Sequence, residues 1–255
     1  MDTSRPRNRE AVEWGAGAVC AAVDDAMQAG AGAGGAGADG AAPWAKAFCA
    51  VRPPGHQAKA AGPMGYCVLN HVAIGAARAR RVHGARKVAV VDFDAHHGNG
   101  TQEYCERAGE ELFFASVHRS SLFPHKKGPS TPAAAVEEAG AGGGAEGAGL
   151  TLNVALNGRA GNSAAFRAAI GRIVRALEAY QPELLLLSAG FDGHRGEDNE
   201  HTLGLSAEDY GWATAELAKA ADALCGGRCV SVLEGGYKLA SLAECVAAHV
   251  CALGL

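Results

Sequence analysis

At two places in the sequence, an apolar segment is followed directly by acids and histidines, the side chains that hold divalent metal ions in proteins. The run VDFDAHHGNG, residues 91–100, places Asp94 and His96 two positions apart, so both point to the same side of an extended backbone. The run SAGFDGH, residues 188–194, adds a single acid, Asp192. Two carboxylates and one imidazole suit zinc and leave a fourth coordination position open, as a catalytic zinc requires. Taken alone, each run could also be a satisfied polar turn or a helix cap.

Two further runs carry side chains that could assist a reaction at such a metal. In LEGGY, residues 233–237, paired glycines after an apolar segment allow a tight turn that brings Tyr237 over a pocket. Its hydroxyl could donate to a developing oxyanion there. In RPPGHQ, residues 52–57, two prolines fix a rigid loop that presents His56. Both are weaker signals, because a tyrosine at a domain edge is usually packed and a loop histidine is usually solvated or packed.

Alternating strands and helices must position these runs. Apolar, β-branched segments predict buried parallel strands at 87–93, 112–118, 184–189 and 229–233. Helical periodicity predicts helices near 9–28, 69–84, 163–180, 207–224 and 239–253, with Ser163 and Ser206 as N-caps. This alternation predicts an α/β fold with a parallel sheet covered by helices. Ligands in such sheets bind beyond the carboxyl ends of the strands, where the polar runs lie.

Composition bounds the class of protein. The chain has 255 residues, 48% hydrophobic and 20% charged, which is enough for one globular domain with a substantial core. A net charge of −4 argues against a global basic field for nucleic acid. Two Ala/Gly tracts, 29–42 and 133–149, predict surface loops inserted into that single domain, 1–255.

The cysteines and the N-terminus bear on the compartment. Eight cysteines occur without a paired CxxC pattern, and several stand in apolar runs, which favours reduced, buried thiols. Cys225 and Cys229, four apart, are weak evidence for a metal or redox site. The segment AVEWGAGAVCAAV favours a helix over a signal peptide, and no apolar run is long enough to span a membrane. We expect the nucleus or the cytoplasm.

Taken together and in order, the runs RPPGH, GYCVLN, VDFDAHHGNGTQ, SVHRS, SAGFDGHRG and LEGGY resemble the histone deacetylase family, and its class II branch in particular. The similarity extends from about residue 10 to residue 255. It implies an arginase–deacetylase type α/β fold, with helices on both faces of the parallel sheet, and one zinc ion per chain. It also implies hydrolysis of the acetamide of Nε-acetyl-lysine in histones or other proteins. The implied partners are an acetylated protein or peptide and corepressor-type proteins, with no direct binding to nucleic acid or membrane.

The resemblance also assigns roles to individual residues. Its implied zinc ligands are Asp94, His96 and Asp192. Its implied catalytic residues are Tyr237, which polarises the substrate carbonyl, His56 as the first histidine of a tandem pair, Asp92 as the carboxylate partner of His56, Gln57 and Asn99. Gly65 and Tyr66 match the wall of the acetyl-lysine tunnel, and Phe123 its rim. A structural potassium site is implied for Asp92, Asp94, His96, Ser116 and Val117.

Three features depart from the family pattern. The second tandem histidine, the family's general base, is Gln57 here, and an amide offers hydrogen bonds but no titratable site. The family's first strand and the early loop at the tunnel rim have no counterpart, so we expect the domain to be truncated at its N-terminus. Finally, two rim turns differ, at 125–129 and 197–200, which leaves the substrate preference open.

These departures keep other functions open. The first alternative is a catalytically weak or inactive protein that binds acyl-lysine, and Gln57 favours it. The second is a deacetylase of acetylated polyamines. A dimanganese enzyme of arginase type is disfavoured, because the run around Asp192 holds one acid rather than two.

Overall fold

A six-stranded sheet organises the chain. The computed structural model describes residues 6–29, 44–120, 122–124, 150–157, 161–197 and 202–255. The strands are β1 (Lys46–Cys49), β2 (Val88–Asp92), β3 (Leu112–Arg119), β4 (Leu150–Leu156), β5 (Leu184–Ala189) and β6 (Cys229–Leu233). The helices are α1 (Pro6–Gln28), α2 (His71–His83), α3 (Asn99–Ala108), α4 (Ser163–Tyr180), α5 (Ala207–Cys225) and α6 (Leu239–Leu253), with a short 3₁₀ turn at Gly109–Glu111.

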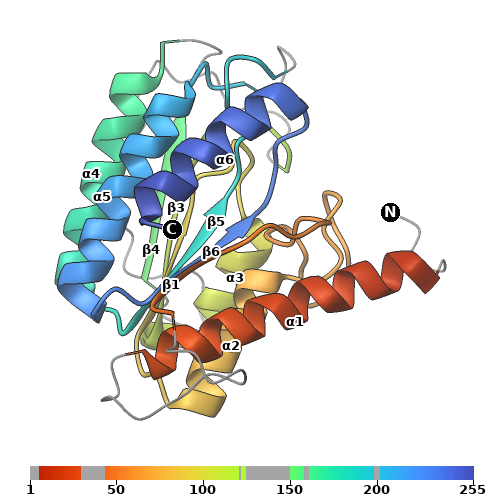
Figure 1. Ribbon diagram of the computed structural model, residues 1–255, viewed down its shortest axis with the longest axis vertical. Coiled ribbons are helices and arrows are strands. Elements are labelled where there is room, and N and C mark those ends of the chain that lie inside the picture. Colours follow the sequence, from red (N-terminus) through yellow and green to blue (C-terminus); the bar gives the residue numbers. More distant parts are fainter. Residues whose placement is uncertain (1–5, 30–43, 121, 125–149, 158–160, 198–201) are drawn as a thin grey trace.

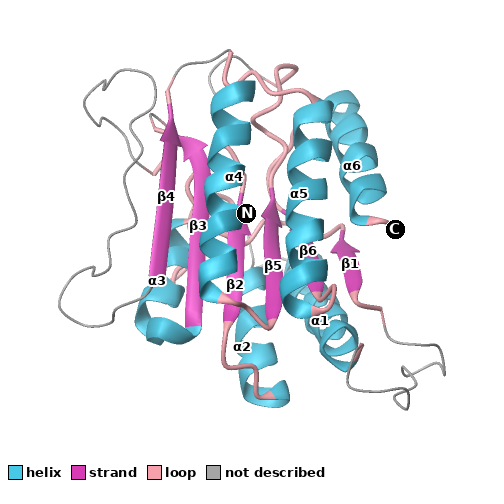
Figure 2. Cartoon of the chain, turned by 90° about the vertical axis from the view of Figure 1, so that its left-hand side faces the viewer, coloured by secondary structure: helices cyan, strands magenta, loops and turns pink. Residues whose placement is uncertain are grey.

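The strand order is β1-β6-β5-β2-β3-β4, and every pair is parallel. Figure 2 shows the strands pointing the same way, so their carboxyl ends share one edge of the sheet. The register pairs Asp92 on β2 with Ser188 on β5, and Ala189 on β5 with Leu233 on β6. The segments that follow these three strands therefore begin side by side.

Helices cover both faces of the sheet, as predicted (Figures 1 and 2). Alternate residues of β2 enter different cores: Ala89 and Val91 belong to the cluster that includes residues of α4, α5 and α6. Val88 and Val90 belong to the cluster that includes residues of α1, α2 and α3. Because both faces of β2 are buried, the strand is apolar throughout until Asp92, its last residue.

The four predicted strands and five predicted helices are confirmed, with ends that differ by a few residues. Sequence patterning missed β1, β4 and α3. Strand β1 has only four residues, and the first six residues of α3, NGTQEY, are largely polar. Among the described residues, no helix is long and apolar enough to cross a membrane.

One of the two predicted N-caps is wrong. Ser206 caps α5 by accepting a hydrogen bond from the backbone N–H of Asp209. Ser163 instead becomes the first residue of α4, with Asn162 at the N-cap position. The reason is a tertiary contact, because the Ser163 hydroxyl donates to Asp209 of α5 at 2.7 Å rather than accepting from its own helix.

The eight cysteines are free thiols, as predicted. Six are buried, but the expectation of burial is wrong for Cys251, which is exposed on α6, and only partly met by Cys20. The two predicted Ala/Gly loops, 29–42 and 133–149, lie outside the described residues except for Ala29. The same holds for the rim turn 125–129 and for residues 198–200 of the second rim turn.

Candidate metal centre

Asp94, His96 and Asp192 converge at the carboxyl edge of the sheet. Each offers one ligand atom, and these atoms all lie within 4.8 Å of one another. The Nδ1 atom of His96 is 3.1 Å from Asp94 Oδ1 and 2.7 Å from Asp192 Oδ2. Residues almost a hundred positions apart meet because β2 and β5 are neighbouring strands. The structure thus brings together all three predicted ligands.

Backbone N–H groups hold the two carboxylates in place. Gly235 N–H donates to Asp94 Oδ2 at 2.8 Å, and Ala95 N–H donates to Asp192 Oδ1 at 2.9 Å. The N–H of His96 donates to Asp94 Oδ1 at 2.8 Å. The segments after β2 and β6 therefore orient the acids that come from β2 and β5, which fixes the cluster from three strands at once.

Glycine is required on two sides of this cluster. A Cβ atom at Gly190 would lie 2.1 Å from Asp94 Oδ2, and one at Gly235 would lie 2.6 Å from the same oxygen and 2.8 Å from the Asp192 carboxyl carbon. Neither position can accept a side chain unless the acids move. Gly190 of the SAGFDGH run and Gly235 of the LEGGY run thus make room for the carboxylates.

The electrostatics of the cluster fit a bound cation. Asp94 and Asp192 are buried at 1% and 0% exposure, and burial together with the charge of Asp94 raises the pKa of Asp192. Burial opposes protonation of His96, but the carboxylates of Asp192 and Asp94 outweigh it and raise the pKa of His96 to about 11. The two buried acids therefore favour a positive charge between them. A divalent metal bound to neutral His96 would supply that charge, and the N/O donor set suits zinc.

His56 and Asp92 form a buried pair next to the cluster. Their Nδ1 and Oδ2 atoms are 2.9 Å apart, and the Nε2 atom of His56 lies 3.9 Å from Asp94 Oδ1. Burial lowers the basicity of His56, but Asp92 and Asp94 overcome it and raise the pKa of His56 to about 10. The predicted pairing of His56 with Asp92 is therefore present in the fold.

Gln57 is buried beside His56, with 3% of its surface exposed. Its Nε2 atom faces the carbonyl oxygen of His97 at 3.5 Å. Its Oε1 atom lies so close to Gly65 that a Cβ atom there would overlap it. Gly65 adopts φ +54°, which glycine reaches at little cost. The amide of Gln57 therefore occupies the space beneath Gly65.

Tyr66 and Tyr237 lie against each other. Their rings meet edge to face with centroids 6.5 Å apart; Tyr66 is largely exposed, whereas Tyr237 is half exposed. Partial burial and the carboxylates of Asp94 and Asp192 raise the pKa of the Tyr237 hydroxyl, which keeps it protonated as a donor. A Cβ atom on Gly65 would lie 3.2 Å from the ring of Phe123. Gly65 and Phe123 therefore lie close together, and Tyr66 follows Gly65 directly; the part of these three residues in a substrate tunnel stays a prediction.

The remaining predicted residues are less closely tied to the cluster. Asn99 begins α3, and its side-chain amide donates to the sulfur of Met64 at 3.4 Å. Ser116 pairs with Asp92 in the sheet register, and its hydroxyl is 2.9 Å from His118 Nδ1. A catalytic role for Asn99 and the potassium site, which also includes Val117, stay predictions.

Two buried glutamates at the site had no predicted role. Glu234, in the LEGGY run, accepts hydrogen bonds from the backbone N–H groups of Gly55 and His56. Glu197 accepts them from Tyr237 and Lys238. The signal for Glu234 was an acid directly after an apolar strand, where its side chain must find partners. For Glu197 the signals were its position soon after Asp192 and its place at the start of the rim turn 197–200.

Comparison with known proteins places the chain in a family. A sequence model described as the histone deacetylase domain matches residues 4–253. Type-2 histone deacetylase 2 of Dictyostelium discoideum is 38% identical over 97% of this chain and 14% of its own length. Histone deacetylase 14, chloroplastic, of Arabidopsis thaliana is 38% identical over 78% of this chain and 44% of its own. Polyamine deacetylase HDAC10 of Homo sapiens is 40% identical over 77% of this chain and 28% of its own. The chain thus spans less than half the length of these relatives.

Solved structures agree on the fold. The HD domain of HDA15 superposes with a TM-score of 0.74 and 28% identity, over 96% of this chain and 62% of that one. The acetylpolyamine aminohydrolase from Burkholderia pseudomallei gives the same TM-score and identity, over 94% of this chain and 61% of that one. The predicted arginase–deacetylase type fold is confirmed. The chain belongs to the histone deacetylase family.

Proposed function

We propose that this chain is a zinc-dependent hydrolase of linear acetamides, with Nε-acetyl-lysine in a protein or peptide as its substrate. One observation carries the proposal: Asp94, His96 and Asp192, which come from the segments after two neighbouring strands, place their ligand atoms within 4.8 Å of one another in a buried cluster. Three protein ligands leave one coordination position open, as in catalytic zinc sites. When bound, zinc would polarise the amide carbonyl as a Lewis acid.

The surrounding side chains then have separate tasks. Tyr237, held protonated, donates a hydrogen bond to the oxygen of the acetamide as negative charge develops there. His56, held by Asp92 at 2.9 Å, is the imidazole placed to move a proton at the reacting carbon and nitrogen. Tyr66, whose ring meets that of Tyr237, and Phe123, which lies close to Gly65, would line the path of an uncharged acetyl-lysine side chain.

Gln57 sets the expected rate. It replaces a base with an amide that carries no titratable proton, and loss of general acid–base help typically costs on the order of 10²–10⁴ in rate. We therefore propose slow turnover. The competing proposal, an acyl-lysine-binding protein without turnover, draws on the same buried Gln57.

A polyamine substrate is the second candidate. Two relatives, polyamine deacetylase HDAC10 and the acetylpolyamine aminohydrolase, are named for polyamine substrates and match most of this chain. The chemistry at the cluster is the same for both substrates, so the rim decides between them. Only a direct comparison of an acetyl-lysine peptide with N-acetylated polyamines distinguishes the two candidates.

The test combines metal content with turnover. We expect about one zinc per chain by elemental analysis and slow release of acetate from an acetyl-lysine peptide. Asp94→Ala and Asp192→Ala should lose both zinc and turnover. Asp222→Ala is the matched control, because this acid is half exposed and pairs with Lys46 on the surface, so its zinc content should not change. A zinc-loaded chain that hydrolyses neither substrate class would overturn the proposal of an enzyme.

A further inference from the structure

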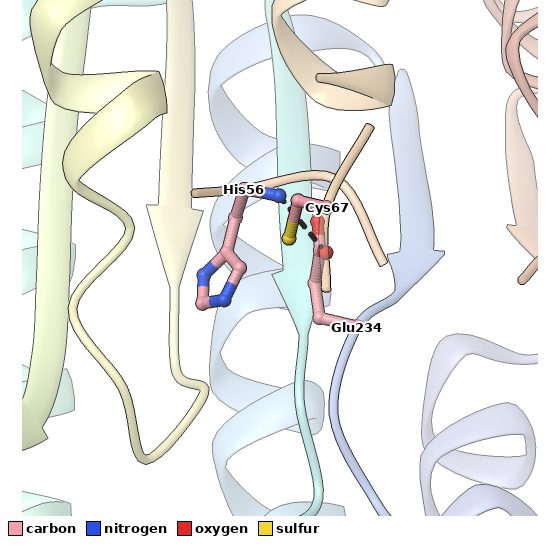
Figure 3. A group of neighbouring side chains, drawn as sticks. All are labelled: His56, Cys67 and Glu234. Atoms are coloured by element: carbon pink, nitrogen blue, oxygen red, sulfur yellow. Dashed lines mark hydrogen bonds between the residues drawn. The ribbon is translucent and has the colours of Figure 1, made fainter. Parts of the chain in front are cut away.

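Glu234 connects the end of β6 to the loop that carries His56. The side chain is buried, with 4% of its surface exposed. Its Oε2 atom accepts hydrogen bonds from the backbone N–H of Gly55 at 2.6 Å and of His56 at 3.1 Å, and Figure 3 shows the bond to His56. Its Oε1 atom accepts the hydroxyl of Ser188 at 3.1 Å. All three partners are donors, so both oxygens of the carboxylate are in use.

The peptide on the other side of His56 is also fixed. Its carbonyl oxygen accepts the N–H of Thr101 at 3.0 Å and the Thr101 hydroxyl at 3.3 Å. The side-chain amide of Asn70 reaches the same oxygen at 3.4 Å. Both peptide groups of His56 are therefore anchored, one by Glu234 from β6 and one by Thr101 and Asn70.

This anchoring sets the direction of the imidazole. A Cβ atom at Gly55 would lie 2.7 Å from His71 N and from Leu69 O, so the loop is packed closely against the start of α2. With its backbone held there, His56 directs Nδ1 to Asp92 at 2.9 Å. Without the Glu234 carboxylate, two buried N–H groups would lose their acceptor, and the loop would lose the contact that holds it to β6.

His56, Cys67 and Glu234 also form a group whose ligand atoms lie within 4.8 Å of one another (Figure 3). Their contacts do not favour a second metal ion. The carboxylate already accepts three hydrogen bonds, and His56 Nδ1 faces Asp92. Burial raises the pKa of the Cys67 thiol well above its usual range, so the thiolate that binds metals is disfavoured. The group is a support for the loop.

We propose that Glu234 is a positioning residue, which fixes the backbone of His56 so that its imidazole stays on Asp92 beside the metal ligands. The inference rests on the proposed hydrolase function, because it assigns Glu234 a task in that reaction. This role is more specific than a general contribution to stability. Within the loop, Glu234 accepts hydrogen bonds only from the backbone N–H groups of His56 and of its neighbour Gly55.

The kinetic test compares Glu234→Ala with Glu234→Gln in zinc-loaded protein. We expect Glu234→Ala to lower kcat by about 10- to 100-fold with KM changed by less than about twofold, because misplacing a catalytic group affects the chemical step. Glu234→Gln should recover most of kcat, because the amide oxygen can accept both N–H groups and the amide nitrogen can donate to Ser188. Equal loss in both variants would assign the effect to charge and overturn the positioning role.

A second measurement does not depend on turnover. Amide hydrogen exchange at Gly55 and His56, followed by NMR, should accelerate in Glu234→Ala and stay near the wild-type rate in Glu234→Gln. If the wild type carries zinc but shows no turnover, the proposed function fails while exchange still decides whether Glu234 holds the loop. Unchanged exchange in Glu234→Ala would overturn the anchoring itself.

The matched control is Asp209→Ala. Asp209 is also a buried carboxylate that accepts a backbone N–H, that of Ser206, but it caps α5 and pairs with Arg167. We expect this variant to lower the melting temperature while kcat per zinc-loaded, folded molecule stays at the wild-type value. A comparable fall in kcat would show that loss of any buried acid impairs the site, and the specific role of Glu234 would be wrong.

Discussion

Glu197 binds the backbone of Tyr237. Its Oε1 atom accepts the N–H of Tyr237 and the N–H of Lys238, both at 3.0 Å. Helix α6 begins at Leu239, and its N-cap residue Lys238 makes no side-chain capping bond. Glu197 therefore accepts the N–H of the N-cap residue, as the glutamate of a capping box does, although it comes from another segment. Because Glu197 follows Asp192 by five residues, it ties the segment of the third predicted ligand to Tyr237.

We predict that Glu197→Ala lowers kcat by about tenfold or more, because Tyr237 loses the support that aims its hydroxyl. The loss of a cap should also lower the free energy of unfolding by about 1 kcal/mol. Glu197→Gln keeps an acceptor oxygen and should restore both quantities. Steady-state kinetics and chemical denaturation check this, and a Gln variant as impaired as the Ala variant would refute the capping explanation.

A glycine substitution tests the shape of the metal cluster. Gly190→Ala places a Cβ atom 2.1 Å from Asp94 Oδ2, so the carboxylate must move. We predict that the variant loses zinc affinity and turnover although no ligand is changed. Elemental analysis after dialysis measures the effect.

Gly17→Ala is the matched control for Gly190→Ala. Gly17 lies in α1, and a Cβ atom there meets nothing within 4 Å. Zinc content should stay the same, and the free energy of unfolding should rise by roughly 0.5–1 kcal/mol because alanine favours a helix interior. Zinc retained at the wild-type level by Gly190→Ala would mean that zinc binding does not require Asp94 in the position that the glycine leaves open.

Gln57→His should increase turnover. The amide nitrogen of Gln57 faces the carbonyl oxygen of His97 at 3.5 Å, so a ring N–H in its place has an acceptor already in position. Restoring general acid–base help predicts a gain on the order of 10²–10⁴ in kcat. Gln57→Met, similar in size but without a titratable group, is the control and should give no gain. The absence of a gain in folded, zinc-loaded Gln57→His would show that the missing base does not limit the reaction.

The order of strands and helices was largely readable from the sequence, because β2, β5 and β6 are buried on both faces and are therefore continuous apolar runs. Strand β4 lacks such a continuous apolar run because its burial alternates, with Thr151, Asn153 and Ala155 only partly buried. Sequence also could not show that Ser163 would donate to Asp209, since that depends on α4 packing beside α5.

The same limit applies to the site. Asp94, His96 and Asp192 could be predicted because each stands in a run of recognisable composition directly after a strand. Glu234 and Glu197 act through backbone N–H groups of residues that are distant in sequence, and any residue except proline can present an N–H. The identity of the residue that donates the N–H therefore gives no sign of such a bond, and only the folded chain reveals it.

A buried histidine makes stability depend on pH. His249 on α6 has no exposed surface, and its ring nitrogens lie 2.7 Å from the Thr214 hydroxyl and 2.8 Å from the Ser231 hydroxyl. The Thr214 hydroxyl donates to the carbonyl oxygen of Tyr210 and so accepts from the imidazole, which leaves the other ring nitrogen to accept from Ser231. This pattern is that of a neutral ring. Burial lowers the pKa of His249 from 6.5 to about 3.

Because the folded pKa lies below the unfolded one, the unfolded chain binds the extra proton between pH 6.5 and about 3. The contribution of His249 to stability is therefore complete above pH 6.5 and is lost as the pH falls, by up to about 1.4 kcal/mol per pH unit. We predict that His249→Gln, which cannot titrate, loses less stability than the wild type between pH 7 and pH 5. Urea denaturation at each pH measures both slopes, and the contributions of all other groups cancel in their difference. Parallel curves for the two proteins would show that His249 has the same pKa in the folded and the unfolded chain, so that its hydroxyl partners do not hold it neutral.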